Sequence, residues 1–146
     1  MQLARWKGAQ VFGTASSANL DFVRSLGAEA IDYSAGPVEL KVYDVDVVID
    51  TVGGEIPQRS LRLLRRGGTL VTVAARFAED FGTAEGVRAT SAGRTAPQRL
   101  EDITQLIEAG ILNPHVYRVF PLEEARQAQE LSQTGHGQGR IVLRIR

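Results

Sequence analysis

The sequence has 146 residues, which is enough for one domain with a core of its own. Its 17 basic residues balance 17 acidic ones, so no overall charge favours binding to nucleic acid or to an anionic membrane surface. The absence of cysteine excludes disulfides, thiolate catalysis and cysteine-ligated zinc, and the two histidines, His115 and His136, are too few for a histidine metal cage. No apolar run approaches the roughly 20 residues of a membrane span, and charge appears too early for a secretory signal. We therefore expect a cytoplasmic protein without a metal site.

Short strands and helices alternate along the predicted chain, and glycines separate them. The predicted helices cover residues 2–7, 18–26, 55–66, 98–109 and a segment that begins near 122. The predicted strands cover residues 10–14, 29–32, 45–50, 69–75, 87–91, 115–120 and 141–145. This alternation indicates an α/β fold with a Rossmann-like, doubly wound parallel sheet.

The clearest predicted strand is Val45–Asp50. Its β-branched run lacks polar alternation, which predicts a strand covered on both faces, with Val47, Val48 and Ile49 in the core. The helix expected after it carries two arginines in its last turn and ends at Gly67-Gly68.

No glycine-rich phosphate loop follows a predicted strand. Gly135-His-Gly-Gln-Gly139 has the glycines, but it lies between the last helix and the last strand. A phosphate cradle needs strand, loop and helix in that order, so this segment is predicted to be a connector. Neither histidine has a serine and a carboxylate nearby in sequence to form a hydrolytic triad, so we predict no catalytic residue.

Three strand ends carry residues suited to a dinucleotide. Thr14, Ser16 and Ser17 follow the first strand, where an NAD site usually has an acidic residue. Their hydroxyls suit a 2′-phosphate and favour NADP, although the serines are equally suited to capping the next helix. Val52 and Gly53 follow the strand Val45–Asp50, where glycine lets a ribose or phosphate approach the backbone or simply permits a tight turn. Ala74 ends the next strand with a small side chain.

Several short segments together form a recognisable pattern along nearly the whole chain. They are residues 2–9, 13–17, 25–33, 44–54 (Asp-Val-Asp-Val-Val-Ile-Asp-Thr-Val-Gly-Gly), 64–71, 118–125 and 139–143. In this order they resemble the cofactor-binding domain of the medium-chain dehydrogenase/reductase family, in its zinc-independent, quinone-oxidoreductase-like branch. The resemblance implies that Ser16, Ser17 and Tyr33 surround an adenosine 2′-phosphate. It also implies that Val52 and Gly53 border a cofactor ribose and that Ala74 lies near the nicotinamide. Ala18 and Asn19 stand where the family often has a basic residue.

The resemblance also implies a division of the chain. Residues 1–112 match a partial dinucleotide-binding domain, and residues 113–146 match a segment that returns to the GroES-like substrate domain in relatives. The family's first strand and glycine-rich loop have no counterpart here. In the strand order 3-2-1-4-5-6 that strand is central, so its absence leaves a gap between residues 10–14 and 45–50. The chain is then a fragment, or pairs those two strands directly, or takes a strand from a partner.

The function implied by the resemblance is an NADPH-dependent oxidoreductase that reduces quinones, enones or related carbonyl compounds, with weak or absent NADP binding without the phosphate loop. The alternative is a non-catalytic remnant that acts as a dimerisation or association module. In either case we expect a homodimer, because family members pair the strand at 87–91 across a two-fold axis and little in that strand blocks such pairing.

Overall fold

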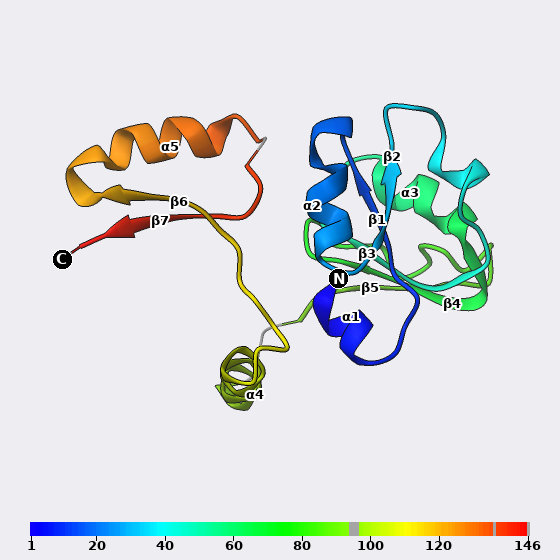
Figure 1. Ribbon diagram of the computed structural model, residues 1–146. Helices are drawn as coiled ribbons and strands as arrows, with labels where there is room; N and C mark the ends of the chain where they lie inside the picture. Colours follow the sequence, from blue (N-terminus) through cyan, green and yellow to red (C-terminus); the bar gives the residue numbers. More distant parts are fainter. Residues whose placement is uncertain (94–96, 136, 146) are drawn as a thin grey trace. The chain divides into compact units, whose positions relative to one another are not determined.

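The structure is a computed structural model that describes residues 1–93, 97–135 and 137–145 (Figure 1). Its contacts divide the chain into two compact units. The first comprises Met1–Ala30 and Pro97–Arg146, and the second comprises Ile31–Ala96. The predicted division after residue 112, which concerns the return to a substrate domain in relatives, stays a prediction.

The N-terminal segment of the first unit packs a helix tightly on a strand. It consists of α1 (Gln2–Trp6), β1 (Phe12–Ala15), the 3-10 turn η1 (Ser17–Asn19) and α2 (Leu20–Ser25). Ala15, Val23 and Ala28 form a small buried cluster. A Cβ atom on Gly13 would lie 2.7 Å from Cγ1 of Val23, so β1 and α2 are close enough to require glycine there. β2 (Glu29–Asp32) pairs with β1, and the boundary between the two units runs through β2.

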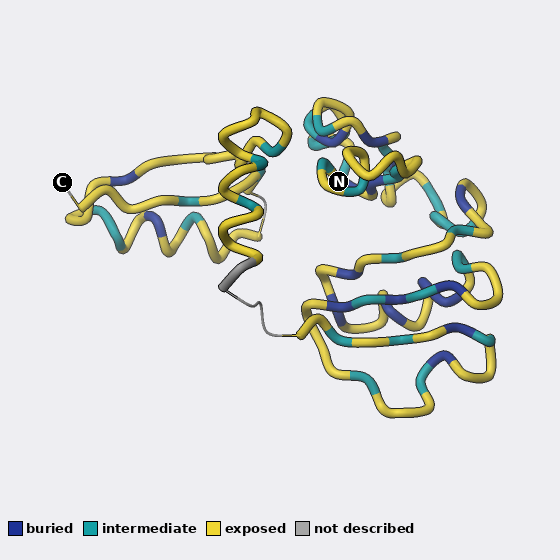
Figure 2. Tube along the Cα trace, turned by 90° about the horizontal axis from the view of Figure 1, so that it is seen from below, coloured by how far each residue is buried: buried dark blue, intermediate teal, exposed yellow. Residues whose placement is uncertain are grey.

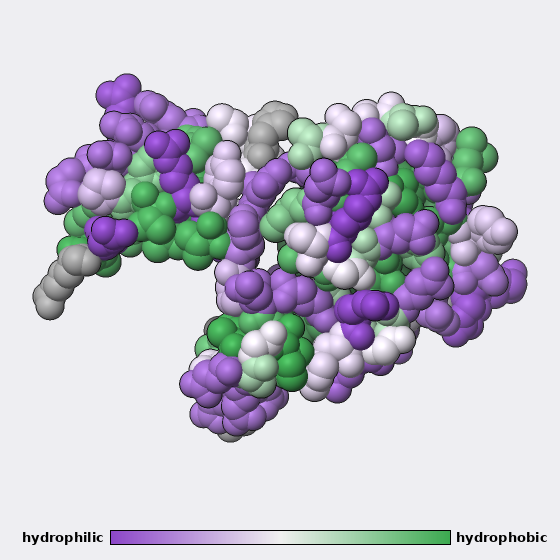
Figure 3. Space-filling model, in the orientation of Figure 1, coloured by the Kyte–Doolittle hydropathy of each residue, from purple (hydrophilic) through white to green (hydrophobic). Residues whose placement is uncertain are grey.

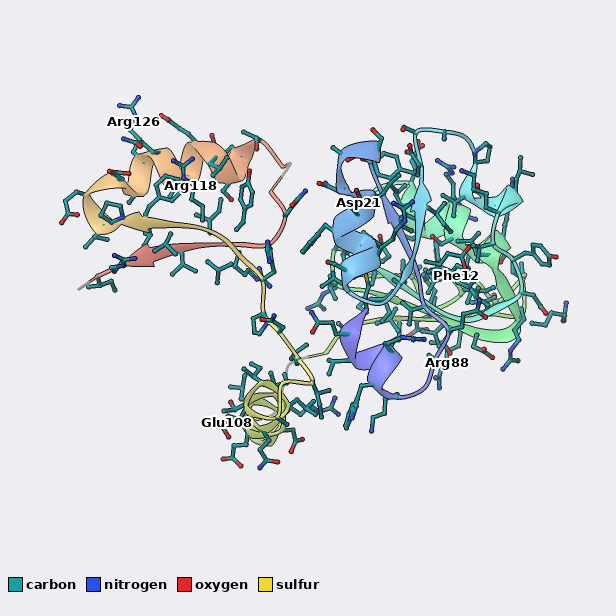
Figure 4. All side chains as sticks on the ribbon, viewed as in Figure 1. Phe12, Asp21, Arg88, Glu108, Arg118 and Arg126 are labelled. Carbon is teal, nitrogen blue, oxygen red and sulfur yellow. The ribbon has the colours of Figure 1, made fainter. Side chains whose placement is uncertain are left out.

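The C-terminal segment of the first unit is a strand–helix–strand motif preceded by a helix. Its elements are α4 (Pro97–Glu108), β6 (Val116–Pro121), η4 (Leu122–Glu124), α5 (Ala125–Gln133) and β7 (Arg140–Arg144). β6 and β7 pair in parallel. The buried apolar residues of this segment are Phe120 and Ala128. The Arg118 guanidinium lies 4.8 Å from the ring centre of Phe120, whereas Arg126 projects outward from α5 (Figure 4).

The second unit is a three-stranded parallel sheet with the order β3-β4-β5. Its elements are η2 (Val38–Leu40), β3 (Val45–Asp50), α3 (Ile56–Ser60), η3 (Leu61–Leu63), β4 (Leu64–Thr72) and β5 (Arg88–Ser91). Leu61, Leu70 and Val87 form its buried core, with Val48 among the partly buried residues packed on it. Figure 2 shows that buried stretches are short and that most of the chain is exposed. The parallel sheets confirm the predicted α/β fold.

The prediction that β3 is buried on both faces is wrong. Val48 packs on the core, but Val47 and Ile49 are 54% and 64% exposed. The side chains of η3 and of the segment after β4 cover one face of the sheet only, and β3 is an edge strand. Among the described residues, β1 and β3 belong to different sheets and are not paired with each other, and how the place of the family's first strand is filled stays a prediction.

The helix predicted over residues 55–66 is also shorter than expected. It ends in η3 at Leu63, and β4 already begins at Leu64, which pairs with Val45. Gly67-Gly68 does not end a helix but forms an irregularity within β4, where Gly67 has a φ of 77°. A Cβ on Gly68 would lie 2.9 Å from the carbonyl oxygen of Arg65, so the irregularity requires glycine. No helix within the described ranges is long and apolar enough to cross a membrane.

Candidate cofactor-binding site

The carboxyl ends of β3 and β4 are joined by a buried hydrogen bond between two side chains. Asp50 and Thr72 are partners in the parallel register, and each is the last residue of its strand. Asp50 is 3% exposed and Thr72 is fully buried. The Thr72 hydroxyl donates to Oδ2 of Asp50 over 2.6 Å. This end of a parallel sheet is where open α/β sheets bind ligands.

The same two side chains hold the turns that follow the strands. Oδ1 of Asp50 accepts hydrogen bonds from the amides of Val52 and Gly53, both at 3.0 Å. The Thr72 hydroxyl oxygen accepts one from the amide of Ala74 at 3.1 Å. The structure therefore brings together three of the predicted site residues, Val52, Gly53 and Ala74, around the Asp50–Thr72 pair.

Gly53 occupies a position that excludes a side chain. Its φ is 80°, in the left-handed region, and a Cβ built on it would lie 3.1 Å from Cβ of Ala74. Gly53 itself is buried, whereas Val52 is 73% exposed and Ala74 is also exposed. Glycine at position 53 therefore lets the turn after β3 pack closely against Ala74, and the exposed residues Val52 and Ala74 lie at the end of the sheet where open α/β sheets bind ligands.

The Asp50 carboxyl group is held as an anion. Burial acts to raise its pKa, but the hydrogen bonds from the Thr72 hydroxyl and from the amides of Gly53 and Val52 outweigh burial and lower the pKa below its ordinary value of 3.8. At neutral pH both carboxylate oxygens are acceptors, which matches the three donors that surround them.

The predicted residues for the adenosine end lie apart from these turns in sequence. Thr14 is an exposed residue of β1, and Ser16 and Ser17 stand at the start of η1. The hydroxyl of Ser16 makes no capping hydrogen bond there, so the capping alternative is not realised at Ser16. Tyr33 directly follows β2 and is 57% exposed. Thr14, Ser16 and Ser17 belong to the first unit, whereas the other four predicted site residues belong to the second.

The histidines and possible metal ligands form no site in the described part of the chain. His115 packs its ring on Phe22, with ring centres 4.6 Å apart, and His136 lies outside the described residues. Within residues 1–93, 97–135 and 137–145, no group of three or more histidine, cysteine, aspartate or glutamate residues could hold a metal ion.

Sequence reasoning did not identify Asp50 and Thr72 as site residues. A signal for Asp50 was available, since an aspartate two residues before a buried turn commonly accepts hydrogen bonds from the following amides. Thr72 had no such signal, because its link to Asp50 depends on the parallel register between two strands.

The sequence profile of a family described as "Zinc-binding dehydrogenase" matches residues 26–143. The chain belongs to this family. Its resemblance to the cofactor-binding part of medium-chain dehydrogenases/reductases is thereby confirmed. The described residues nevertheless offer no donor set for the zinc ion in the family's description.

Individual relatives agree with this assignment. The chain is 34% identical to the quinone oxidoreductase from Coxiella burnetii, with a TM-score of 0.92. The match covers 99% of this chain and 48% of the Coxiella chain. The chain is 28% identical to the NAD(P)H oxidoreductase RTN4IP1, mitochondrial, from Danio rerio, over 99% of this chain and 45% of that protein. It is also 35% identical to the polyketide synthase GfsB from Streptomyces halstedii, over 99% of this chain and 3% of that protein. The chain thus spans about half the length of the two oxidoreductases.

Proposed function

We propose that this chain is the cofactor-binding portion of a cytoplasmic, NADPH-dependent oxidoreductase that reduces quinones, enones or related carbonyl compounds. Family membership supports oxidoreductase chemistry, and two of the relatives are named as a quinone oxidoreductase and an NAD(P)H oxidoreductase. The observation that carries the proposal is the Asp50–Thr72 pair, which fixes Val52, Gly53 and Ala74 at the carboxyl ends of two parallel strands.

The bound nicotinamide would supply the hydride, and the protein would supply binding and orientation. In this proposal Val52 and Gly53 border the cofactor ribose, and Ala74 lies near the nicotinamide end. Any side chain at Gly53 would meet Ala74, so the arrangement of the two turns depends on glycine at this position.

The preference for NADP rests on the first unit and on Tyr33. Ser16 and Ser17 carry uncharged hydroxyls where an NAD-binding protein usually places a carboxylate, which would repel a 2′-phosphate. The Ser16 hydroxyl makes no capping hydrogen bond, and Tyr33 is exposed. These features support a role in 2′-phosphate binding for Ser16 and Ser17 in the first unit and, separately, for Tyr33 in the second, with Thr14 as a further cofactor-binding residue of β1.

Catalysis is tested by following NADPH oxidation by the purified chain with 1,4-naphthoquinone, a ubiquinone analogue and a simple enone. Oxidation that depends on both the acceptor and the protein supports the proposal, and Gly53→Val should abolish it. A chain that binds NADPH but oxidises it with none of the acceptors would show that this polypeptide alone is not the enzyme.

The alternative function, an association module, is favoured by one specific observation. Val47 and Ile49 are exposed on β3, Val73 is exposed directly after β4, and hydrophobic residues are visible elsewhere on the surface (Figure 3). A homodimer that pairs β5 with its two-fold mate would be one way to associate. Light scattering tests it. A mass near 15.9 kDa, the single-chain value, would contradict dimerisation.

A further inference from the structure

We propose that a pocket between η2, α3, η3 and the loop before β5 binds a small zwitterion, an α-amino acid with an apolar side chain, through Arg62 and Glu85. The site goes beyond the proposed function, because it lies away from the strand ends assigned to the cofactor. Arg62 lies two residues before β4 and Glu85 three residues before β5, so both stand at the amino end of the parallel sheet. Asp50 and Thr72 mark the opposite, carboxyl end.

The pocket has the size of a small-molecule site. Its volume is about 380 Å³, at the lower end of the roughly 300–1,000 Å³ range of ligand pockets. Apolar contact comes from Leu61, a buried core residue, and from the methylene stems of the two arginines. The lining residues all belong to the second unit: Glu39, Gln58, Arg59, Leu61, Arg62 and Glu85. This lining suits a ligand that combines a small apolar part with charged groups.

Two of the charged side chains in the pocket neutralise each other. Nε and Nη2 of Arg59 donate to the two carboxylate oxygens of Glu39, over 3.2 and 3.5 Å. A hydrogen bond from the backbone amide of Glu39 and the Arg59 guanidinium lower the pKa of Glu39, and the charge of Arg62 acts in the same direction. Glu39 is therefore an anion at neutral pH, and Arg59 balances its charge.

The other two charged side chains are left for a ligand. Within the described ranges of the chain, neither Arg62 nor Glu85 makes an ion pair with another side chain, and both are exposed. A simple anion drawn to Arg62 would meet two carboxylates in the pocket, and a simple cation drawn to Glu85 would meet two guanidinium groups. A ligand with both charges satisfies both side chains. Its carboxylate matches the guanidinium fork of Arg62, and its ammonium group donates to Glu85.

Three probes with the same side chain separate the two charges. L-leucine carries both charges, N-acetyl-L-leucine keeps only the carboxylate, and L-leucinamide keeps only the ammonium group. Calorimetry would measure their dissociation constants for the unmodified chain, for Arg62→Gln and Glu85→Gln, and for the control Arg65→Gln. Arg65 is an exposed arginine near the start of β4 that pairs with Asp46 and does not line the pocket. Circular dichroism melting would establish that each variant is folded.

We expect leucine to bind the unmodified chain about tenfold more tightly than either single-charge probe, the effect of one charged hydrogen-bonded contact. Arg62→Gln should remove the advantage of leucine over leucinamide, and Glu85→Gln its advantage over N-acetyl-leucine. Arg65→Gln should change leucine binding by less than about twofold. Equal binding of the three probes by the unmodified chain would overturn the proposal, as would no binding of leucine or equal weakening by Arg62→Gln and Arg65→Gln. Because these measurements involve no dinucleotide, such a result would leave the proposed function standing.

Discussion

The hydroxyl of Thr72 donates a 2.6 Å hydrogen bond to Oδ2 of Asp50, directly across the parallel pairing of β4 with β3. The two residues are 22 positions apart in sequence, and both are buried. Through this contact the turns after β3 and β4 are held by one network. The contribution of that network to the unfolding free energy and its contribution to ligand binding can be measured separately.

The network predicts how stability depends on pH. The folded-state pKa of Asp50 is lowered because hydrogen bonds from Thr72, Gly53 and Val52 outweigh the opposing effect of burial. Its stabilisation is therefore fully present above the ordinary pKa of 3.8 and is lost as pH falls through the folded-state value. Urea unfolding below that ordinary value should show a steeper loss of unfolding free energy for the unmodified chain than for Asp50→Asn.

Other carboxyl groups do not affect the difference in pH dependence between the unmodified chain and Asp50→Asn. Asp32 and Glu39 also have lowered pKa values, but both are present in the two proteins, so the difference between the curves isolates Asp50. Near neutral pH, Asp50→Asn should itself lose about 1–3 kcal/mol, because a charged acceptor is replaced. Parallel pH curves for the two proteins would contradict a stabilising carboxylate at this position.

Two adjacent glycines give a matched test of the close approach at Ala74. Gly53 and Gly54 both have positive φ values, 80° and 62°, so alanine at either costs about 1–2 kcal/mol of backbone strain. A Cβ at Gly53 would also lie 3.1 Å from Cβ of Ala74, whereas a Cβ at Gly54 has nothing within 4 Å. Chemical denaturation should therefore show a larger loss for Gly53→Ala, by about 1 kcal/mol. Equal losses would mean that Ala74 moves aside freely.

Neighbouring valines of β3 test which face of the sheet is covered. Val48 packs on the core formed by Leu61, Leu70 and Val87, and Val48→Asp should abolish cooperative unfolding because an unpaired carboxylate there costs several kcal/mol. Val47 is 54% exposed, so Val47→Asp should cost less than about 1 kcal/mol. Circular dichroism melting distinguishes the two. If Val47→Asp also fails to fold, the exposed face is covered in the working protein.

The sequence predicted the type and order of the strands and helices well, because their signals are local. The β-branched run Val45–Asp50 is a strand with the predicted bounds. The helix expected over 55–66 was too long because the pairing of Leu64 with Val45 and the irregularity at Gly67-Gly68 depend on a partner strand. The exposure of Val47 and Ile49 likewise depends on what covers the sheet, which residue periodicity does not encode.

At the candidate site the sequence identified the turn residues but not what holds them. Gly53 was predictable because a glycine pair directly after an apolar strand indicates a positive φ. The partnership of Asp50 with Thr72 required the register of β3 against β4, which only the structure supplies. The predicted roles of Thr14, Ser16, Ser17, Tyr33, Val52, Gly53 and Ala74 in cofactor binding stay predictions.

The central claim, a dinucleotide site with a preference for NADP, is tested most directly by titrating the purified chain with NADPH and with NADH in a calorimeter. We predict that NADPH binds more tightly, and that Ser17→Asp reverses the order because its carboxylate repels the 2′-phosphate and accepts hydrogen bonds from free ribose hydroxyls. Tighter binding of NADH by the unmodified chain would contradict the assignment of Ser16, Ser17 and Tyr33. The absence of binding by both dinucleotides would contradict the cofactor site as a whole.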